Sequence, residues 1–320
     1  MAAPMDMWDR ALEAKLNRRV DAGHLRDLLC GRERIHAASL PDFSDLSAEV
    51  VLELRAIWPE VPVQRRRALL ASLRELADDN LEYNFKHIYL VALQDEDEAV
   101  RAAAVEGLWE EDSTLVLHSL EGLALTDSSA DVRASAAAAL GRFVYRAAVG
   151  DMSAADTDHL QELLRRLVQE APDGSDLQMR SAESLAYLGS DSVLDECISR
   201  LYYDGGEDEQ ASALTAMGRT MDPRWKPTVL EELDSPSPRL QFHAARAAGE
   251  MGLEEAVQRL AQLIAGSDRE LQHTAVWALG QIGDRTSTKL LESLLETPDE
   301  GLREAAEDAL NEAAYSGPLE

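Results

Sequence analysis

A thirteen-residue pattern recurs along this chain at a nearly constant spacing. In its clearest copy, Leu271–Gly283, it reads Leu-Gln-His-Thr-Ala-Val-Trp-Ala-Leu-Gly-Gln-Ile-Gly, and Leu240–Gly252 repeats its apolar and small positions 31 residues earlier. Seven copies share the frame, and they begin at Val100, Val132, Leu177, Glu209, Leu240, Leu271 and Leu302. The steps between them are 32, 45, 32, 31, 31 and 31 residues. Such a period predicts an array of stacked supersecondary units rather than one globular core.

Each copy has the periodicity of an amphipathic helix. At 100° per residue, positions 1, 5, 8, 9 and 12 of the frame fall on one face. In the copy that starts at Leu271, this face is apolar and consists of Leu271, Ala275, Ala278, Leu279 and Ile282. Positions 6, 10 and 13 are mostly Ala or Gly, which lets a neighbouring helix approach, and Gly at position 13 suits a helix C-cap. A second amphipathic helix is expected after several copies, over residues 192–201, 254–264 and 287–295.

The pattern (V/L)-R/Q-x-x-A-A-x-A-L-G-x-I-G, followed by a short turn and a second helix, resembles the short HEAT-like repeats of the phycobilisome-lyase type. The resemblance covers about residues 97–314, although Trp109 stands where Gly is usual and Glu209 where an aliphatic residue is usual. It implies an all-α fold, a right-handed α-solenoid (superhelix) of antiparallel helix pairs. It implies no single function, because this repeat serves many unrelated tasks.

Departures from the period predict how the chain is organised. We expect N-terminal capping helices and an irregular segment over residues 1–46, degenerate first repeats over 47–96, seven HEAT-like repeats over 97–315 and a tail at 316–320. The 45-residue step predicts a long insertion near 144–176, in which a lengthened helix runs through Val149 and a long helix ends at Glu170. A solenoid needs end caps with one polar face, so the N-terminal region is expected to be a cap.

Within the N-terminal region, residues 6–30 are expected to form one or two amphipathic helices, and 34–46 an irregular, extended segment. One more degenerate helix pair is expected over 47–58 and 63–77. The turns between helix pairs are acidic. A cluster such as 95–98 is expected to cap a helix rather than to bind a cation, because it lacks the Gly and terminal Glu of an EF-hand loop.

The chain is strongly acidic, with 60 Asp and Glu against 31 Lys and Arg and a formal net charge of −29. This charge repels the phosphates of nucleic acids and the surface of an anionic membrane, so we expect no nucleic-acid or membrane partner. The acidity is interpreted as a solvated surface, with docking of basic partners as the alternative. Cys30 and Cys197 form no CxxC pair, and no apolar run reaches about 18 residues, so a cytoplasmic protein with reduced thiols is predicted.

The common signatures of catalysis are missing from the sequence: it has no GxGxxG, GxxxxGK(S/T), GxSxG or HExxH motif. None of the seven histidines is followed by Glu, whereas the HEAT-repeat deoxyhypusine hydroxylases carry repeated His-Glu pairs that hold two irons. HEAT-like DNA glycosylases need a basic groove, which the acidic charge disfavours. We therefore expect no catalytic residues, no metal and no cofactor.

The candidate site lies on the side of each frame helix opposite its apolar face. The resemblance implies that positions 3, 4, 7 and 11 look into a concave groove. In the C-terminal copies these positions are rich in Arg and aromatic side chains, although aromatic residues make up only 5% of the chain. The candidate partner-binding residues are Met179, Arg180, Tyr187, Arg219, Phe242, His243, Arg246, His273, Trp277 and Gln281.

Tyr, Trp, Arg and Met dominate binding hot spots. The leading hypothesis is a non-catalytic scaffold or adaptor that grips a peptide or helix segment of another protein, and Arg180, Arg219 and Arg246 suit a carboxylate-rich segment. Three alternatives stay open: Phe242 and Trp277 pack on neighbouring repeats; the protein is a bilin lyase-like or tetrapyrrole-binding chaperone; or it is a self-associating structural element.

Overall fold

The computed structural model describes residues 22–31, 33–80 and 82–316, and these residues form helices and turns without any strand. The helices expected before residue 22 and the tail after residue 316 lie outside the described residues. A helix that crosses a membrane needs a long apolar stretch, and no helix in the described part of the chain has one.

Two compact units meet within helix α8 (Ala130–Ala148), and they comprise residues 1–139 and 140–320. The helices of the N-terminal unit that precede α8 are α2 (Ala22–Cys30), η1 (Ala37–Phe43), α3 (Ala48–Ile57), η2 (Trp58–Glu60), α4 (Val63–Asp79), α5 (Lys86–Ala92), α6 (Glu98–Gly107) and α7 (Thr114–Thr126). Those of the C-terminal unit that follow α8 are α9 (Ala154–Glu170), α10 (Asp176–Leu185), η3 (Ala186–Leu188), α11 (Ser192–Tyr203), α12 (Glu207–Thr220), η4 (Pro223–Trp225), α13 (Lys226–Glu232), α14 (Pro238–Glu250), η5 (Glu254–Ala256), α15 (Val257–Ile264), α16 (Arg269–Ile282), α17 (Arg285–Leu294) and α18 (Glu300–Ser316).

Polar side chains in the turns cap many of these helices. The N-cap side chains that accept a hydrogen bond from a backbone N–H two or three residues ahead include Ser47, Asp97, Ser153, Ser175, Asp191, Ser237, Asp268 and Asp284. Such bonds satisfy donors that the first helical turn leaves free. At the other end, Gly189, Gly252 and Gly283 have φ values of 89°, 61° and 61°, as expected for glycines that terminate helices. The sequence prediction of acidic caps and glycine stops is confirmed.

A buried ion pair lies inside the N-terminal unit. Asp95 accepts hydrogen bonds of 2.6 Å from both Arg66 Nη1 and Trp58 Nε1, and the side chains of Arg66 and Asp95 are almost fully buried. Removal of one partner from such a pair leaves an uncompensated buried charge. Within the acidic 95–98 turn, Asp97 therefore caps α6 as expected, while Asp95 joins α3–α4 to the next helix pair.

Two irregular regions were predicted with different success. The two long helices predicted near residues 144–176 are present, because α8 extends to Ala148 and α9 covers Ala154–Glu170. The prediction that residues 34–46 are extended is wrong, because Ala37–Phe43 forms the 3-10 helix η1. This helix buries the Phe43 side chain completely, so tertiary packing of one aromatic ring outweighs the irregular local sequence.

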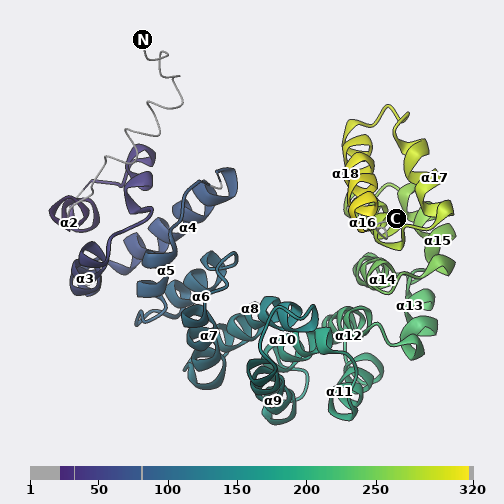
Figure 1. Ribbon diagram of the computed structural model, residues 1–320, viewed down its shortest axis with the longest axis horizontal. Coiled ribbons are helices and arrows are strands. Elements are labelled where there is room, and N and C mark those ends of the chain that lie inside the picture. Colours follow the sequence, from purple (N-terminus) through teal and green to yellow (C-terminus); the bar gives the residue numbers. More distant parts are fainter. Residues whose placement is uncertain (1–21, 32, 81, 317–320) are drawn as a thin grey trace. The chain divides into compact units, whose positions relative to one another are not determined.

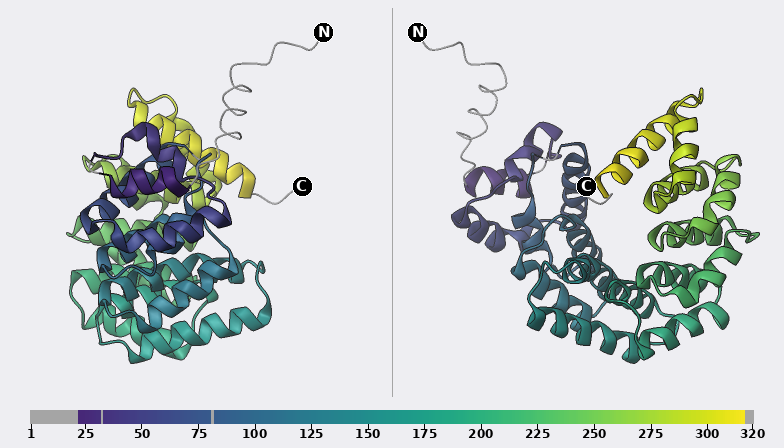
Figure 2. Two further views of the ribbon diagram at one scale, coloured as in Figure 1. Left: turned by 90° about the vertical axis from the view of Figure 1, so that its left-hand side faces the viewer. Right: turned by 45° about the vertical axis from the view of Figure 1, so that its right-hand side comes forward.

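In the C-terminal unit the helices form two layers (Figures 1 and 2). Helices α10, α12, α14, α16 and α18 form one layer, on the inner side of the bend that this unit describes, and α9, α11, α13, α15 and α17 form the outer layer. Each inner helix from α12 onward packs on the inner helix before it. Gly218 permits one such approach, since a Cβ placed there would lie 2.7 Å from Ala247 Cα.

We expect Gly218→Ala to lower the free energy of unfolding by about 1–3 kcal/mol, because the new methyl group meets the backbone of α14 rather than a flexible side chain. The matched control is Gly122→Ala in α7, where an added Cβ meets nothing within 4 Å. That change should raise stability by up to about 1 kcal/mol through helix propensity alone. Urea unfolding followed by circular dichroism measures both, and equal effects of the two substitutions would contradict the close approach.

Candidate functional site

Six side chains from the frame helices α8, α12, α14 and α16 and the short helix η3 form a series of ring, cation–π and electrostatic interactions. We call this set the ladder, and its members in spatial order are Tyr145, Tyr187, Arg219, Glu250, Arg246 and Trp277. They come from α8, η3, α12, α14, α14 and α16, respectively. The regular repeat produces this arrangement, because equivalent frame positions on stacked helices lie side by side.

The first half of the ladder is an aromatic pair covered by a cation. The rings of Tyr145 and Tyr187 meet edge to face, with centroids 5.5 Å apart. The guanidinium carbon of Arg219 lies 4.6 Å from the centroid of Tyr187 and therefore makes a cation–π contact. Arg219 Nη1 also donates a 2.9 Å hydrogen bond to the backbone oxygen of Glu183, which fixes the guanidinium over the ring.

The second half repeats this chemistry one helix further on. The guanidinium carbon of Arg246 lies 4.8 Å from the ring centroid of Trp277. Between the two arginines stands Glu250, whose Oε1 lies 3.9 Å from Arg246 Nη2. Burial raises the pKa of Glu250 above its ordinary value, while Arg219 and Arg246 act in the opposite direction. The ladder thus holds two cations and one desolvated carboxylate.

A second group of polar side chains is fully paired beside the ladder. Glu183 accepts 2.8 Å hydrogen bonds at both carboxylate oxygens from Arg180 Nη1, and a 2.7 Å bond from Ser212 Oγ. The Glu183 side chain is buried, so these bonds offset the cost of burying its charge. They also join α10 to α12.

His243 lies close to four arginines and is neutral at physiological pH. Its Nδ1 lies 2.9 Å from Thr215 Oγ1, and its ring meets Phe242 edge to face at 5.2 Å. Burial first, and then the nearby cations Arg239, Arg246, Arg180 and Arg219, together lower the pKa of His243 to about 4. The field at this point of the inner layer is therefore positive, although the chain as a whole is acidic.

The structure brings most, but not all, of the sequence-predicted site residues together. Arg180, Tyr187, Arg219, Phe242, His243, Arg246 and Trp277 lie in or beside the ladder. Gln281 and His273 instead contact α18: Gln281 Nε2 donates to Glu312 at 3.0 Å, and the His273 ring lies beside Gly301. The placement of Met179 on an open surface is wrong, because its side chain is only 5% exposed.

The helical wheel explains the error at Met179. A wheel of one helix shows positions 3 and 4 opposite the apolar face, but it contains no information on the neighbouring helices that can cover them. Ala211 and Ser212, at the same positions of α12, are buried as well. Positions 7 and 11 stay at least partly open in the copies that begin at Glu209, Leu240 and Leu271.

Two ladder members were missed by the sequence prediction. Tyr145, whose side chain is 54% exposed, lies one position beyond the thirteen-residue frame. Continuing the helical spacing 4, 7, 11 by three residues along the lengthened helix, to position 14, would have found it. Glu250 occupies position 11 in its copy, but one acidic residue in an acidic chain gives no sign that it lies between two arginines.

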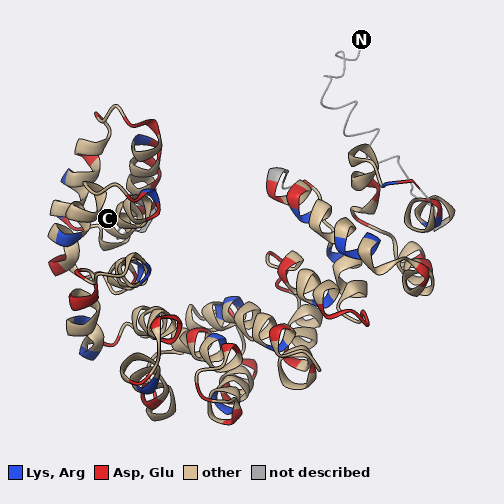
Figure 3. Cartoon of the chain, turned by 180° about the vertical axis from the view of Figure 1, so that it is seen from behind, with Lys and Arg blue, Asp and Glu red and all other residues tan. Residues whose placement is uncertain are grey.

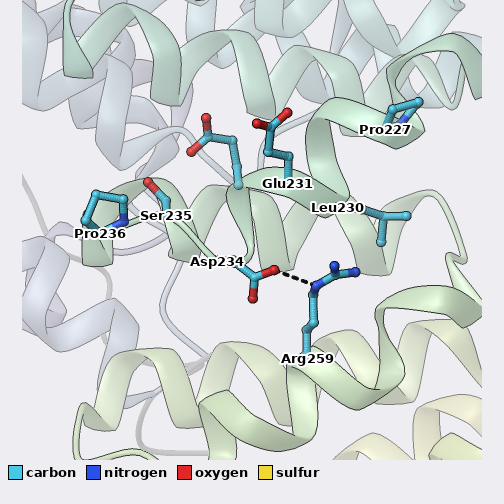
Figure 4. Close-up of a pocket in the computed structure, with 8 residues that line it drawn as sticks. Pro227, Leu230, Glu231, Asp234, Ser235, Pro236 and Arg259 are labelled. Carbon is cyan, nitrogen blue, oxygen red and sulfur yellow. Dashed lines mark hydrogen bonds and ion pairs between the residues drawn. The ribbon is translucent and has the colours of Figure 1, made fainter.

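Other features of the described residues are less suited to a site. No group of three or more His, Cys, Asp or Glu side chains with metal-binding geometry occurs among them. An open pocket in the outer layer, between α13 and α15, is lined by Pro227, Leu230, Glu231, Glu232, Asp234, Ser235, Pro236 and Arg259 (Figure 4). Its Arg259 donates to Asp234 at 2.7 Å. Acidic residues elsewhere are spread over many turns and helix ends (Figure 3).

Residues 194–272 and 226–311 match the profile of HEAT repeats. The solved complex of CpcE and CpcF of phycocyanin lyase from Nostoc sp. has a TM-score of 0.53 and 20% identity, and the match covers 73% of this chain and 89% of that one. Escherichia coli YibA has a TM-score of 0.45, 15% identity and coverages of 89% and 99%. Yeast importin-beta (Kap95p) has a TM-score of 0.47, 14% identity and coverages of 93% and 44%. No curated protein matches the sequence.

The repeat match and the likeness to the lyase complex confirm the predicted all-α solenoid of HEAT-like repeats. The right-handed sense of the superhelix and the antiparallel orientation within each pair stay predictions. So does the division into a cap, degenerate repeats and seven regular repeats.

The neutral state of His243 predicts an acid-dependent loss of stability. Between the ordinary pKa of 6.5 and the folded-state pKa of about 4, the unfolded chain binds a proton that the folded chain does not. The neutral state of His243 therefore lowers stability little at pH 7, and the free energy of unfolding decreases as pH falls through that window. Allowing for the partial exposure of the ring, we expect wild type to lose about 1 kcal/mol more than His243→Gln between pH 7 and pH 5. Urea titrations at both pH values test this, and equal losses would show that His243 titrates normally.

Proposed function

We propose that this chain, a HEAT-like repeat protein, is a non-catalytic scaffold or adaptor that holds a segment of a partner protein along the inner layer of residues 140–320. A cytoplasmic location, inferred from the cysteine usage and the absence of a long apolar run in the sequence, is part of the same proposal. The observation that carries it is the ladder, in which two guanidinium groups, each stacked on an aromatic ring, lie on either side of one carboxylate.

Several properties of the ladder suit protein binding. Its two cation–π pairs, Arg219 with Tyr187 and Arg246 with Trp277, hold large planar side chains in fixed positions. Fixed side chains lose little conformational entropy when a partner binds, so more of the contact energy appears as affinity. Tyr, Trp and Arg are also the residues most often found to dominate the energy of an interface.

The comparisons add one further point of support. The solved structure with a TM-score of 0.53 is a complex of two chains, CpcE and CpcF. That likeness establishes the fold only, but it is in keeping with a solenoid that functions in contact with another protein.

Truncation of Trp277 in the ladder and of Phe242 beside it should weaken partner binding without unfolding the protein. After a partner has been identified by pull-down and mass spectrometry, we expect the Trp277→Ala, Phe242→Ala double variant to bind it about 2 kcal/mol or more weakly, or roughly 30-fold, as measured by calorimetry. Trp109→Ala is the matched control, because Trp109 is 56% exposed in the N-terminal unit. Equal affinities of the double variant and this control, with helicity unchanged, would remove the basis of the proposal.

The second candidate function, favoured by the likeness to a phycocyanin lyase, is a bilin lyase-like or tetrapyrrole-binding chaperone. Here the arginines would pair with propionate groups, while Tyr187 and Trp277 stack on the tetrapyrrole.

The second candidate predicts a coloured protein. Co-expression with a bilin or haem should give visible absorbance that co-purifies with the chain, and Trp277→Ala should reduce it several-fold while Trp109→Ala leaves it unchanged. A colourless protein under both conditions would leave the scaffold as the function that the ladder supports.

A further inference from the structure

We propose that the ladder selects an acidic partner segment, one whose Asp or Glu side chains are bound by Arg219 and Arg246 and whose apolar atoms rest against Trp277 and Tyr187. Glu250 occupies the carboxylate position when no partner is present. This inference rests on the proposed scaffold function and adds to it the chemistry of the partner.

Stacking leaves the arginines ready to bind an anion. A guanidinium that lies flat on an aromatic ring uses its face for the cation–π contact, while its N–H donors point outward in the plane of the group. Arg219 and Arg246 are both held in this way, at 4.6 Å and 4.8 Å from their rings. Bidentate hydrogen bonding of a carboxylate uses those in-plane donors, so stacking and carboxylate binding are compatible.

Several other arginines in the described part of the chain are paired tightly with carboxylates. Arg101, Arg165 and Arg259 lie 2.7–2.8 Å from the carboxylates of Asp127, Asp191 and Asp234, respectively. These pairs connect neighbouring repeats, and the adjacent carboxylate neutralises the charge of each of these arginines.

The ladder arginines differ from that pattern. Arg246 has its nearest carboxylate oxygen at 3.9 Å, beyond hydrogen-bonding distance. Arg219 forms no ion pair with any residue that the structure describes, and its buried Nε has no acceptor there. Two cations with unused donors thus lie on either side of one loosely held carboxylate.

Glu250 is an internal competitor for these donors. A Cβ on Gly218 would lie 2.8 Å from Glu250 Oε2, so the missing side chain of Gly218 is what makes room for this carboxylate. Burial raises the pKa of Glu250, which shows that its environment does not fully compensate its charge. A partner carboxylate that engages both arginines would displace it or share its place.

The local field distinguishes an acidic from a basic partner. Four arginines act on His243, and because that ring is neutral it adds no charge of its own. Arg180 is neutralised by Glu183 and Arg239 by Asp208, so the unneutralised cations at this point are Arg219 and Arg246. Within a chain of net charge −29, this is a place where an anionic side chain is attracted rather than repelled.

The probe is a phage-displayed library of random twelve-residue peptides, panned on the full-length protein. Phage that bind equally well to the Trp277→Ala variant are discarded, so that the retained peptides are those that use the ladder. We expect Asp and Glu to be enriched at least twofold over the unselected library, together with aromatic or aliphatic residues.

Two substitutions then test the arginines with one synthetic, fluorescein-labelled peptide from the selection. Arg219→Gln and Arg246→Gln should each weaken its binding by about tenfold or more, since hydrogen bonds between charged groups are lost. Arg285→Gln, on the outer helix α17, changes the net charge equally and should leave the affinity within about twofold. Fluorescence anisotropy measures the dissociation constants.

A gain of binding provides a readout that misfolding cannot imitate. Glu250→Gln removes the internal competitor, so the same peptide should bind roughly threefold or more tightly. Glu292→Gln, an exposed carboxylate on α17, is the matched control and should have no such effect.

Each result has one consequence. Acidic enrichment with loss of binding in both arginine variants supports the inference. Retained peptides without acidic enrichment, or with affinities that the arginine variants do not change, overturn it while leaving the scaffold function standing. If panning retains no peptide whose binding depends on Trp277, the scaffold function and the inference are both overturned.

Discussion

Close approach between successive inner helices is the constraint on which the C-terminal unit depends. Added Cβ atoms at Gly218, Gly249 and Gly280 would lie 2.7–2.9 Å from atoms of Ala247, Ala278 and Ala309 on the following helix. Larger residues at either side of these contacts would push the helices apart. Because the residues at these contacts are Gly and Ala, the helices lie close together. Side chains at positions 7 and 11 therefore reach those of the neighbouring repeat, and the ladder forms as a consequence of packing.

Both units contain an arginine near a carboxylate and an indole, but the two arginines differ in exposure. In the N-terminal unit the buried Arg66 side chain binds Asp95, which also accepts a hydrogen bond from the Trp58 indole, so Arg66 joins helix pairs and has no access to a ligand. In the C-terminal unit Arg246 also stands beside an indole, but its side chain remains 46% exposed and its carboxylate neighbour is distant. Burial and the distance to the nearest carboxylate therefore separate a structural arginine from one that can bind a partner.

The repeat pattern predicted the fold well because it depends on local periodicity and on small residues at fixed positions. It placed the frame helices, the glycine stops at Gly252 and Gly283, and the long helices α8 and α9. It failed where contacts between repeats decide the outcome: the burial of Met179 follows from the next helix, and η1 forms because Phe43 enters the core. The role of Glu250 depends on two arginines that lie 31 and 4 residues away in the sequence, and no single-helix pattern contains that information.

The distance between stacked inner helices also fixes the distance between equivalent positions that a bound segment would meet. Packed helices are separated by about 8–10 Å. An extended chain advances about 3.3 Å per residue, so it crosses from one helix to the next in about three residues. A segment in the polyproline II conformation, which has three residues per turn, would therefore present a side chain to equivalent positions of α12, α14 and α16 at every third residue. The spacing of side chains in such a partner would be dictated by the thickness of the helices that it crosses.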